Sequence, residues 1–203
     1  ANVAAAWVLP VALVTLAFGA LGVLAARTLR LWAGWMVVYS VGTLLVAVGL
    51  FSEEGYAAAV YYTAHSTLAS AVLFLLADLI ARQRAKAGDR LDEPDVMPHA
   101  ALLGGLFFVV AVTVAGLPPL SGFVGKLMVL EAARTAPGAV ATWTVLLFAA
   151  LVVIVATART GSALVAASCP SYMWKRPLST STSRPPRRPA TSSPAWPWTV
   201  GSG

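Results

Sequence analysis

Residues 116–126 read GLPPLSGFVGK, and this short stretch decides the fold. Pro118 and Pro119 have no amide N–H, and a proline ring crowds the carbonyl four residues earlier, so a helix that enters the stretch is interrupted there. Gly116 and Gly122 permit unusual backbone angles or the close approach of another helix. The sequence therefore predicts two helical pieces that are joined by a break at Pro118-Pro119.

The composition of the whole chain places this break in a membrane. Of the 203 residues, 59% are hydrophobic and 11% are charged, and the mean hydropathy is +0.79. An ordinary soluble domain has roughly a quarter charged residues, which are needed to cover a surface in water. Lipid must cover most of this surface, so the composition excludes a soluble enzyme.

The net charge of +6 reflects the end of the chain. Five of the 14 basic residues lie in the last 35 positions, which contain no acid. The rest of the chain has nine basic residues and eight acidic residues, so its charge is nearly balanced. The basic balance is therefore local and does not indicate a nucleic-acid binder. The five are Lys175, Arg176, Arg184, Arg187 and Arg188.

Five apolar stretches are long enough to cross a hydrocarbon core, which takes about 20 helical residues. Backbone groups inside lipid must be paired within the segment or the bundle, so these stretches are expected to be helices. The sequence thus predicts an all-α membrane protein, a bundle of about five transmembrane helices of which the fourth is interrupted. The predicted spans are 3–26, 31–51, 56–81, 100–133 and 139–158.

The connections predict an orientation. The first carries Arg27 and Arg30, the second carries only the acids at 53–54, and the third has a cluster of bases over 82–90. Cytoplasmic loops are enriched in Lys and Arg. We therefore expect a multi-pass protein of the cell inner membrane, with the first and third connections and the C-terminus in the cytoplasm.

Lys126 is the strongest candidate for function. No charge lies between His99 and Lys126, so the lysine belongs to a membrane segment, where a charged side chain is costly. An interrupted helix leaves backbone N–H and C=O groups without hydrogen-bond partners. Such groups are tolerated in a membrane where they line a hydrated cavity. A lysine beside such a break is able to exchange a proton. The alternative is a structural lysine whose ammonium reaches the headgroups.

His65 lies near the middle of the third predicted span. Tyr62, Ser66 and Ser70 recur every four residues beside it and give this helix one polar face. A neutral imidazole is able to accept and return protons and suits a relay. The alternative is a packed histidine that forms a hydrogen bond between helices. Asp78 is expected to pair with the basic run that follows it.

The sequence contains none of the usual patterns for cofactor or metal chemistry. The single cysteine, Cys169, excludes an internal disulfide framework and a Cys-based metal site. No cluster of His, Asp and Glu has ligand spacing, and there is no nucleophile elbow, P-loop or dinucleotide fingerprint. We therefore expect no cofactor, no metal and no enzyme activity.

The stretches YYTAHSTL at 61–68, LFLLADLIAR at 73–82 and GLPPLSGFVGK at 116–126 carry a family resemblance. They resemble the antiporter-like subunits shared by respiratory complex I and multisubunit cation/proton antiporters. The sequences of these stretches are most similar to the D subunit of the Mrp/Pha-type monovalent cation/proton antiporter. The resemblance covers residues of about 10 to 164 and corresponds to the later part of a longer family member, so we expect a C-terminal fragment with a partial antiporter-like fold.

The resemblance implies site residues. Titratable residues cross such proteins at mid-membrane in a continuous row, with a lysine in the last interrupted helix and a histidine in the helix before it. Those positions match Lys126 and His65. Arg30 matches a third position loosely, because residues 28–31 read TLRL where the family more often has Asp-hydrophobe-Lys. The family's essential glutamate and its partner lysine lie in earlier helices and have no counterpart here.

The residues after about Leu164 depart from this pattern. Residues 165–203 are rich in Pro, Ser and Arg and show no apolar period, which predicts a disordered tail. Out-of-frame reading of GC-rich DNA yields such a composition, so a frameshift near residue 165 is one explanation. The tail and the opening at Ala1 inside an apolar segment both favour a fragment.

Three functions remain open at this point. The first is a component like the D subunit of a multisubunit Na⁺ or K⁺/H⁺ antiporter that contributes part of a mid-membrane proton path, with other subunits as partners. The second is a proton-pumping membrane subunit of an NADH–quinone oxidoreductase or a membrane hydrogenase. The third is a truncated remnant that transports nothing.

Overall fold

The computed structural model describes residues 3–84, 88–91, 100–118, 120–136 and 138–168. These residues form six helices, and their only β feature is an isolated bridge between Thr28 and Arg90. The predicted tail falls mainly on 169–203, outside the described residues, as does His99. The helices are α1 (Val3–Ala25), α2 (Leu29–Gly49), α3 (Glu53–Gln83), α4 (Ala100–Ala115), α5 (Ser121–Ala133) and α6 (Ala139–Ser168).

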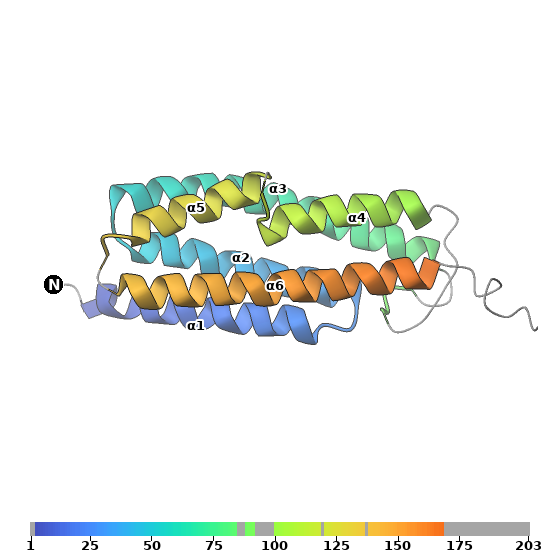
Figure 1. Ribbon diagram of the computed structural model, residues 1–203, viewed down its shortest axis with the longest axis horizontal. Coiled ribbons are helices and arrows are strands. Elements are labelled where there is room, and N and C mark those ends of the chain that lie inside the picture. The colour runs from blue at the N-terminus through green and yellow to red at the C-terminus, as the bar shows by residue number, and fades with distance from the viewer. Residues whose placement is uncertain (1–2, 85–87, 92–99, 119, 137, 169–203) are drawn as a thin grey trace, which may run out of the picture. The chain divides into compact units, whose positions relative to one another are not determined.

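Four of the helices in the described residues are long and apolar enough to cross a membrane, namely α1, α2, α3 and α6. α4 has 16 residues and α5 has 13, so they measure about 24 and 20 Å at 1.5 Å per residue. Neither piece alone reaches across a core of about 30 Å, but they lie end to end beside α3 (Figure 1). Together the two pieces are long enough for one span, so the predicted helical bundle and the interruption of its fourth span are confirmed.

Two helices are longer than predicted. α3 begins at Glu53 because the Ser52 side chain accepts a hydrogen bond from the Gly55 N–H at 3.0 Å and caps the first turn. Glu53 and Glu54 in that turn also suit the positive end of the helix dipole. α6 continues to Ser168, ten residues beyond the predicted end at residue 158, so residues 165–168 are helical and the predicted tail does not include them.

α1 and α2 pack closely because glycines replace side chains where the two backbones meet. A Cβ added at Gly42 would lie 2.6 Å from the Leu16 Cα, and one added at Gly19 would lie 2.7 Å from the Tyr39 backbone nitrogen. Such small residues allow transmembrane helices to approach each other. This contact fixes the position of the Tyr39 backbone against α1.

The outer surface is apolar. Val140 is 80% exposed and Leu75 and Leu102 are each 72% exposed, as expected for side chains that face lipid. The interior contains large side chains from several helices, and the rings of Trp32 in α2 and Phe107 in α4 lie 5.3 Å apart. α4 is therefore held against the bundle up to the break.

Candidate functional site

The break between α4 and α5 has a defined structure. Gly116 has a φ of +77°, a conformation that favours glycine. Its N–H bonds the Thr113 carbonyl at 3.3 Å, and the Leu117 N–H bonds the Val112 carbonyl at 3.2 Å. This pair of bonds, with prolines directly after it, is a Schellman motif that ends α4. The predicted helix break is thus a regular C-cap.

The prolines also release carbonyl groups at the end of α4. In an uninterrupted helix the Val114 and Ala115 carbonyls would accept from the residues four positions later, which here are Pro118 and Pro119. Proline has no N–H to donate. The C-terminal end of α4 therefore presents carbonyl oxygens, at the negative end of its dipole, to the space between α4 and α5.

Lys126 fills this space. Its side chain is 7% exposed, and its Nζ donates a hydrogen bond to the Ala115 carbonyl. Cβ atoms point toward the N-terminus of their helix, so a lysine in the second turn of α5 reaches back to the break. No acidic side chain of the described residues forms an ion pair with it.

Tyr39 of α2 forms the other wall of the lysine site. The Lys126 Nζ lies 4.8 Å from the centroid of the Tyr39 ring, a cation–π distance. The ring is fully buried, and its hydroxyl has no hydrogen-bond partner among the described residues. Sequence reasoning missed Tyr39 as a site residue, because the register of α2 against α5 is set by contacts far apart in the chain.

His65 of α3 contacts the start of α5. Its Nδ1 lies 3.0 Å from the Ser121 Oγ, and the donor depends on the tautomer of the ring. The Tyr61 hydroxyl donates to the Ser121 carbonyl at 3.4 Å. The imidazole is partly buried. The structure thus brings His65 and Lys126 to the same break.

Two glycines create the room between the histidine and the lysine. A Cβ added at Gly122 would lie 2.9 Å from the His65 Nε2 and 2.1 Å from the Thr113 carbonyl oxygen. A Cβ added at Gly116 would lie 2.8 Å from the Lys126 Nζ. Side chains at these positions would fill the space that separates the two titratable groups.

The histidine side of the site opens to the surface of the bundle. A hollow of about 370 Å³ lies between α3 and the break, and its polar wall consists of Tyr61, His65, Thr113 and Ser121. Lys126 does not line this hollow. The lysine is therefore enclosed by α2, α4 and α5, whereas the histidine borders on whatever covers this face.

Arg30 lies apart from this site. Its Nη2 forms an ion pair with the Asp78 Oδ1 at 2.8 Å, and Asp78 also pairs with the Arg82 Nε at 2.6 Å. Asp78 lies about 20 Å along α3 from His65 at 1.5 Å per residue. The expected pairing of Asp78 with the basic run is confirmed for Arg82, and Arg30 joins that pair at the end of the bundle.

The family follows from comparison with known sequences. A family model described as "NADH:quinone oxidoreductase/Mrp antiporter, TM" matches residues 1–157. The chain belongs to this family. The match covers the lysine, the histidine and both sides of the helix break, and it supports the resemblance drawn from the three sequence stretches.

Individual relatives carry names of antiporter components. The chain is 36% identical over 151 residues to the D subunit of a probable K⁺/H⁺ antiporter of Rhizobium meliloti, covering 66% of this chain and 28% of the relative. It is 33% identical over 121 residues to the D subunit of the Na⁺/H⁺ antiporter of Bacillus subtilis, covering 59% and 24%.

A relative from the second functional class is also similar. The N subunit of the NADH-quinone oxidoreductase of Xanthomonas euvesicatoria is 32% identical over 120 residues, covering 59% of this chain and 25% of the relative. The chain thus spans about a quarter of the length of these relatives.

Proposed function

We propose that this chain is part of the D-type subunit of a multisubunit Na⁺ or K⁺/H⁺ antiporter and contributes a segment of its mid-membrane proton path. The chain would then serve a transporter and not an enzyme. The observation that carries the proposal is the buried Lys126 at the end of a broken helix, bonded to a carbonyl and stacked on an aromatic ring. Relatives that are named as D subunits of such antiporters support it.

Lys126 would carry the proton. As an ammonium it is stabilised by the Ala115 carbonyl, by the dipole of α4 and by the Tyr39 ring. None of these neighbours is a formal negative charge, so the neutral amine leaves no unpaired carboxylate behind. A site of this kind tolerates both protonation states, as a group that takes up and releases a proton requires.

His65 would relay protons between Lys126 and the face lined by the hollow. Its Nδ1 contacts Ser121, and its Nε2 faces Gly122 on the side of the break. The two ring nitrogens are thus directed at different neighbours, as a relay requires. Arg30 forms an ion pair with Asp78 at the end of the bundle. We therefore propose that Arg30 holds the first connection in position.

The polar hollow also supports the expected partners. Polar side chains at membrane depth face the interior of a bundle or a hydrated cavity. We infer that other transmembrane segments, from the rest of the same protein or from neighbouring ones, cover Tyr61, His65 and Ser121. The assembly would lie in the cell inner membrane, with the basic first and third connections in the cytoplasm.

A proton-pumping subunit of an NADH–quinone oxidoreductase is the second candidate, favoured by the similarity to the N subunit of that enzyme. The genes beside the coding sequence distinguish the two. Dehydrogenase and iron–sulfur subunits nearby would favour the oxidoreductase, whereas small cation-antiporter subunits would favour the antiporter.

Transport by the complete assembly tests the proposal. In membrane vesicles that contain the full transporter, Lys126→Ala should abolish cation-driven proton movement. Glu131→Gln is a matched control on the same helix, because Glu131 is exposed and pairs with Arg134 at 3.6 Å. The control should transport normally, and unchanged transport in Lys126→Ala would contradict the role of the lysine.

A further inference from the structure

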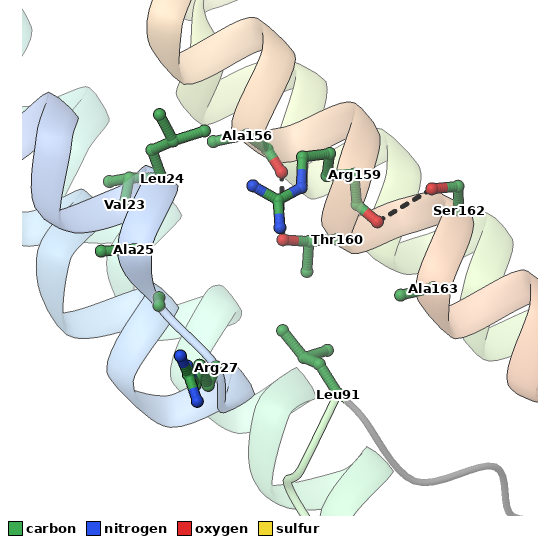
Figure 2. Close-up of a pocket in the computed structure, with 11 residues that line it drawn as sticks. Val23, Leu24, Ala25, Arg27, Leu91, Ala156, Arg159, Thr160, Ser162 and Ala163 are labelled. Atoms are coloured by element: carbon green, nitrogen blue, oxygen red, sulfur yellow. Dashed lines mark hydrogen bonds between the residues drawn. The ribbon is translucent and has the colours of Figure 1, made fainter.

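A second polar hollow lies at one end of the bundle, away from Lys126. It measures about 900 Å³ and lies between the end of α1, the α1–α2 connection and α6. Figure 2 shows Arg27 from the connection and Arg159 from α6 at this hollow. Both arginines are exposed, and neither forms an ion pair in the part of the chain that the structure describes.

The local backbone fixes both arginines. The Leu91 N–H bonds the Arg27 carbonyl at 3.1 Å, and the Leu29 N–H bonds the Asp89 carbonyl at 2.8 Å. These bonds anchor the first connection to the third. Arg159 is held by α6, and its carbonyl accepts from the Ser162 hydroxyl at 2.9 Å. The backbones of the two arginines are thus held on either side of one hollow, which both residues line.

The depth of the hollow matches a lipid headgroup. Arg159 lies about 30 Å along α6 from its first residue, which is one thickness of the hydrocarbon core. Arg27 lies two residues after the end of α1, which is long enough to span that core. The nearby hydroxyl hydrogens are engaged, because Thr160 Oγ1 donates to the Ala156 carbonyl at 3.1 Å. The arginine N–H groups are donors that suit phosphate oxygens.

A separate apolar groove lies between the same two helices, α1 and α6, nearer the middle of the bundle. Its volume is about 200 Å³. The α6 residues of the two hollows follow one helical row, from Val145 through Val152 to Ala156 and Arg159. A molecule with an anionic head and an apolar chain matches both parts of this surface.

We propose that the Arg27–Arg159 hollow binds the phosphate of an anionic phospholipid, with an acyl chain in the groove between α1 and α6. Two cations without acid partners among the described residues provide the charge complementarity. The apolar groove selects a lipid over a soluble anion. This site is independent of the proton path and holds whichever transport function the family member has.

Lipid retention by the purified 203-residue chain tests the proposal. The chain in neutral detergent is titrated with phosphatidylglycerol or phosphatidylcholine, and bound lipid is counted by native mass spectrometry. The wild type should retain phosphatidylglycerol preferentially. Each of Arg27→Gln and Arg159→Gln should reduce this preference about fivefold, and the double variant roughly 25-fold. Equal retention of the two lipids by the wild type would overturn the proposal.

Matched variants separate a specific site from general charge. Arg134→Gln removes an exposed arginine outside the hollow and should leave the preference unchanged, and an equal loss there would overturn the site. Water-soluble glycerophosphoglycerol should compete poorly, whereas competition as strong as that of the intact lipid would show a soluble-anion site and overturn the lipid. If the double variant loses helicity, the single variants decide in the same way.

Discussion

At the scale of residues, the site depends on what surrounds one lysine. The sequence predicts that Lys126 lies in a membrane segment, because no other charge occurs between His99 and that position. The structure adds that its side chain is buried within the bundle. The two prolines predict unpaired backbone groups at the break, and the structure adds that the Ala115 carbonyl accepts a hydrogen bond from Lys126. The ring of Tyr39 does not follow from the sequence. Neither does the Arg30–Asp78 pair, whose members are 48 residues apart.

Substitutions at Tyr39 should separate its ring from its hydroxyl. Tyr39→Leu removes the ring from the Lys126 ammonium, a contact of about 0.5–2 kcal/mol, and should lower cation-driven proton transport several-fold. Tyr39→Phe keeps the ring and removes a buried hydroxyl that has no partner among the described residues, so it should transport as the wild type does. Cation-driven proton transport is measured for both variants. A larger loss of transport in Tyr39→Phe than in Tyr39→Leu would contradict the role of the ring.

Replacement of Gly122, at the start of α5, should be tolerated far less well than replacement of a glycine within α4. Gly122→Ala places a Cβ 2.1 Å from the Thr113 carbonyl oxygen and 2.9 Å from the His65 Nε2, so the two helical pieces must separate. Gly104→Ala meets no atom within 4 Å and gains helix propensity of up to about 1 kcal/mol.

The measurement is thermal unfolding of the purified chain in detergent, followed by circular dichroism. We expect a lower melting temperature for Gly122→Ala, and an equal or higher one for Gly104→Ala. Identical behaviour of the two variants would mean that the break is not tightly packed.

At the scale of elements, the sequence predicts what local chemistry decides. The Pro-Pro pair and Gly116 predict the end of α4, and the structure adds that the end is a Schellman motif. The predicted end of α6 is too early, because Arg159 reads as the first residue after the span. An arginine is able to extend from a helix that continues past the hydrocarbon core, so a charge limits the span but not the helix.

The contact between α1 and α2 gives a second test at this scale. Gly42→Ala brings a Cβ within 2.6 Å of the Leu16 Cα, and overpacking of this kind costs typically about 1–3 kcal/mol. Gly34→Ala is the control in the same helix, because a Cβ there meets nothing within 4 Å. Chemical unfolding in mixed micelles should show destabilisation of Gly42→Ala alone. Equal stability of the two variants would contradict the close contact.

At the scale of the whole molecule, most of the outer surface of the bundle is apolar, and polar side chains gather at the hollow beside His65. The outer residues of the bundle suit lipid, but the hollow beside His65 places four polar side chains at membrane depth. The spacing of Tyr62, Ser66 and Ser70 predicts a polar face on this helix. It does not predict that Ser121 contacts His65, because that pair joins α3 to a helix that begins after the break.

The central proposal is that Lys126 acts by releasing a proton and not merely by being positive. Lys126→Arg tests it most directly, because a guanidinium keeps the charge and its donors but does not deprotonate in proteins. Cation-driven proton flux is measured in vesicles containing the complete transporter, beside the wild type and Glu131→Gln. We expect no flux for Lys126→Arg, with normal assembly of the complex. Wild-type flux in that variant would contradict proton release and assign the lysine a structural role.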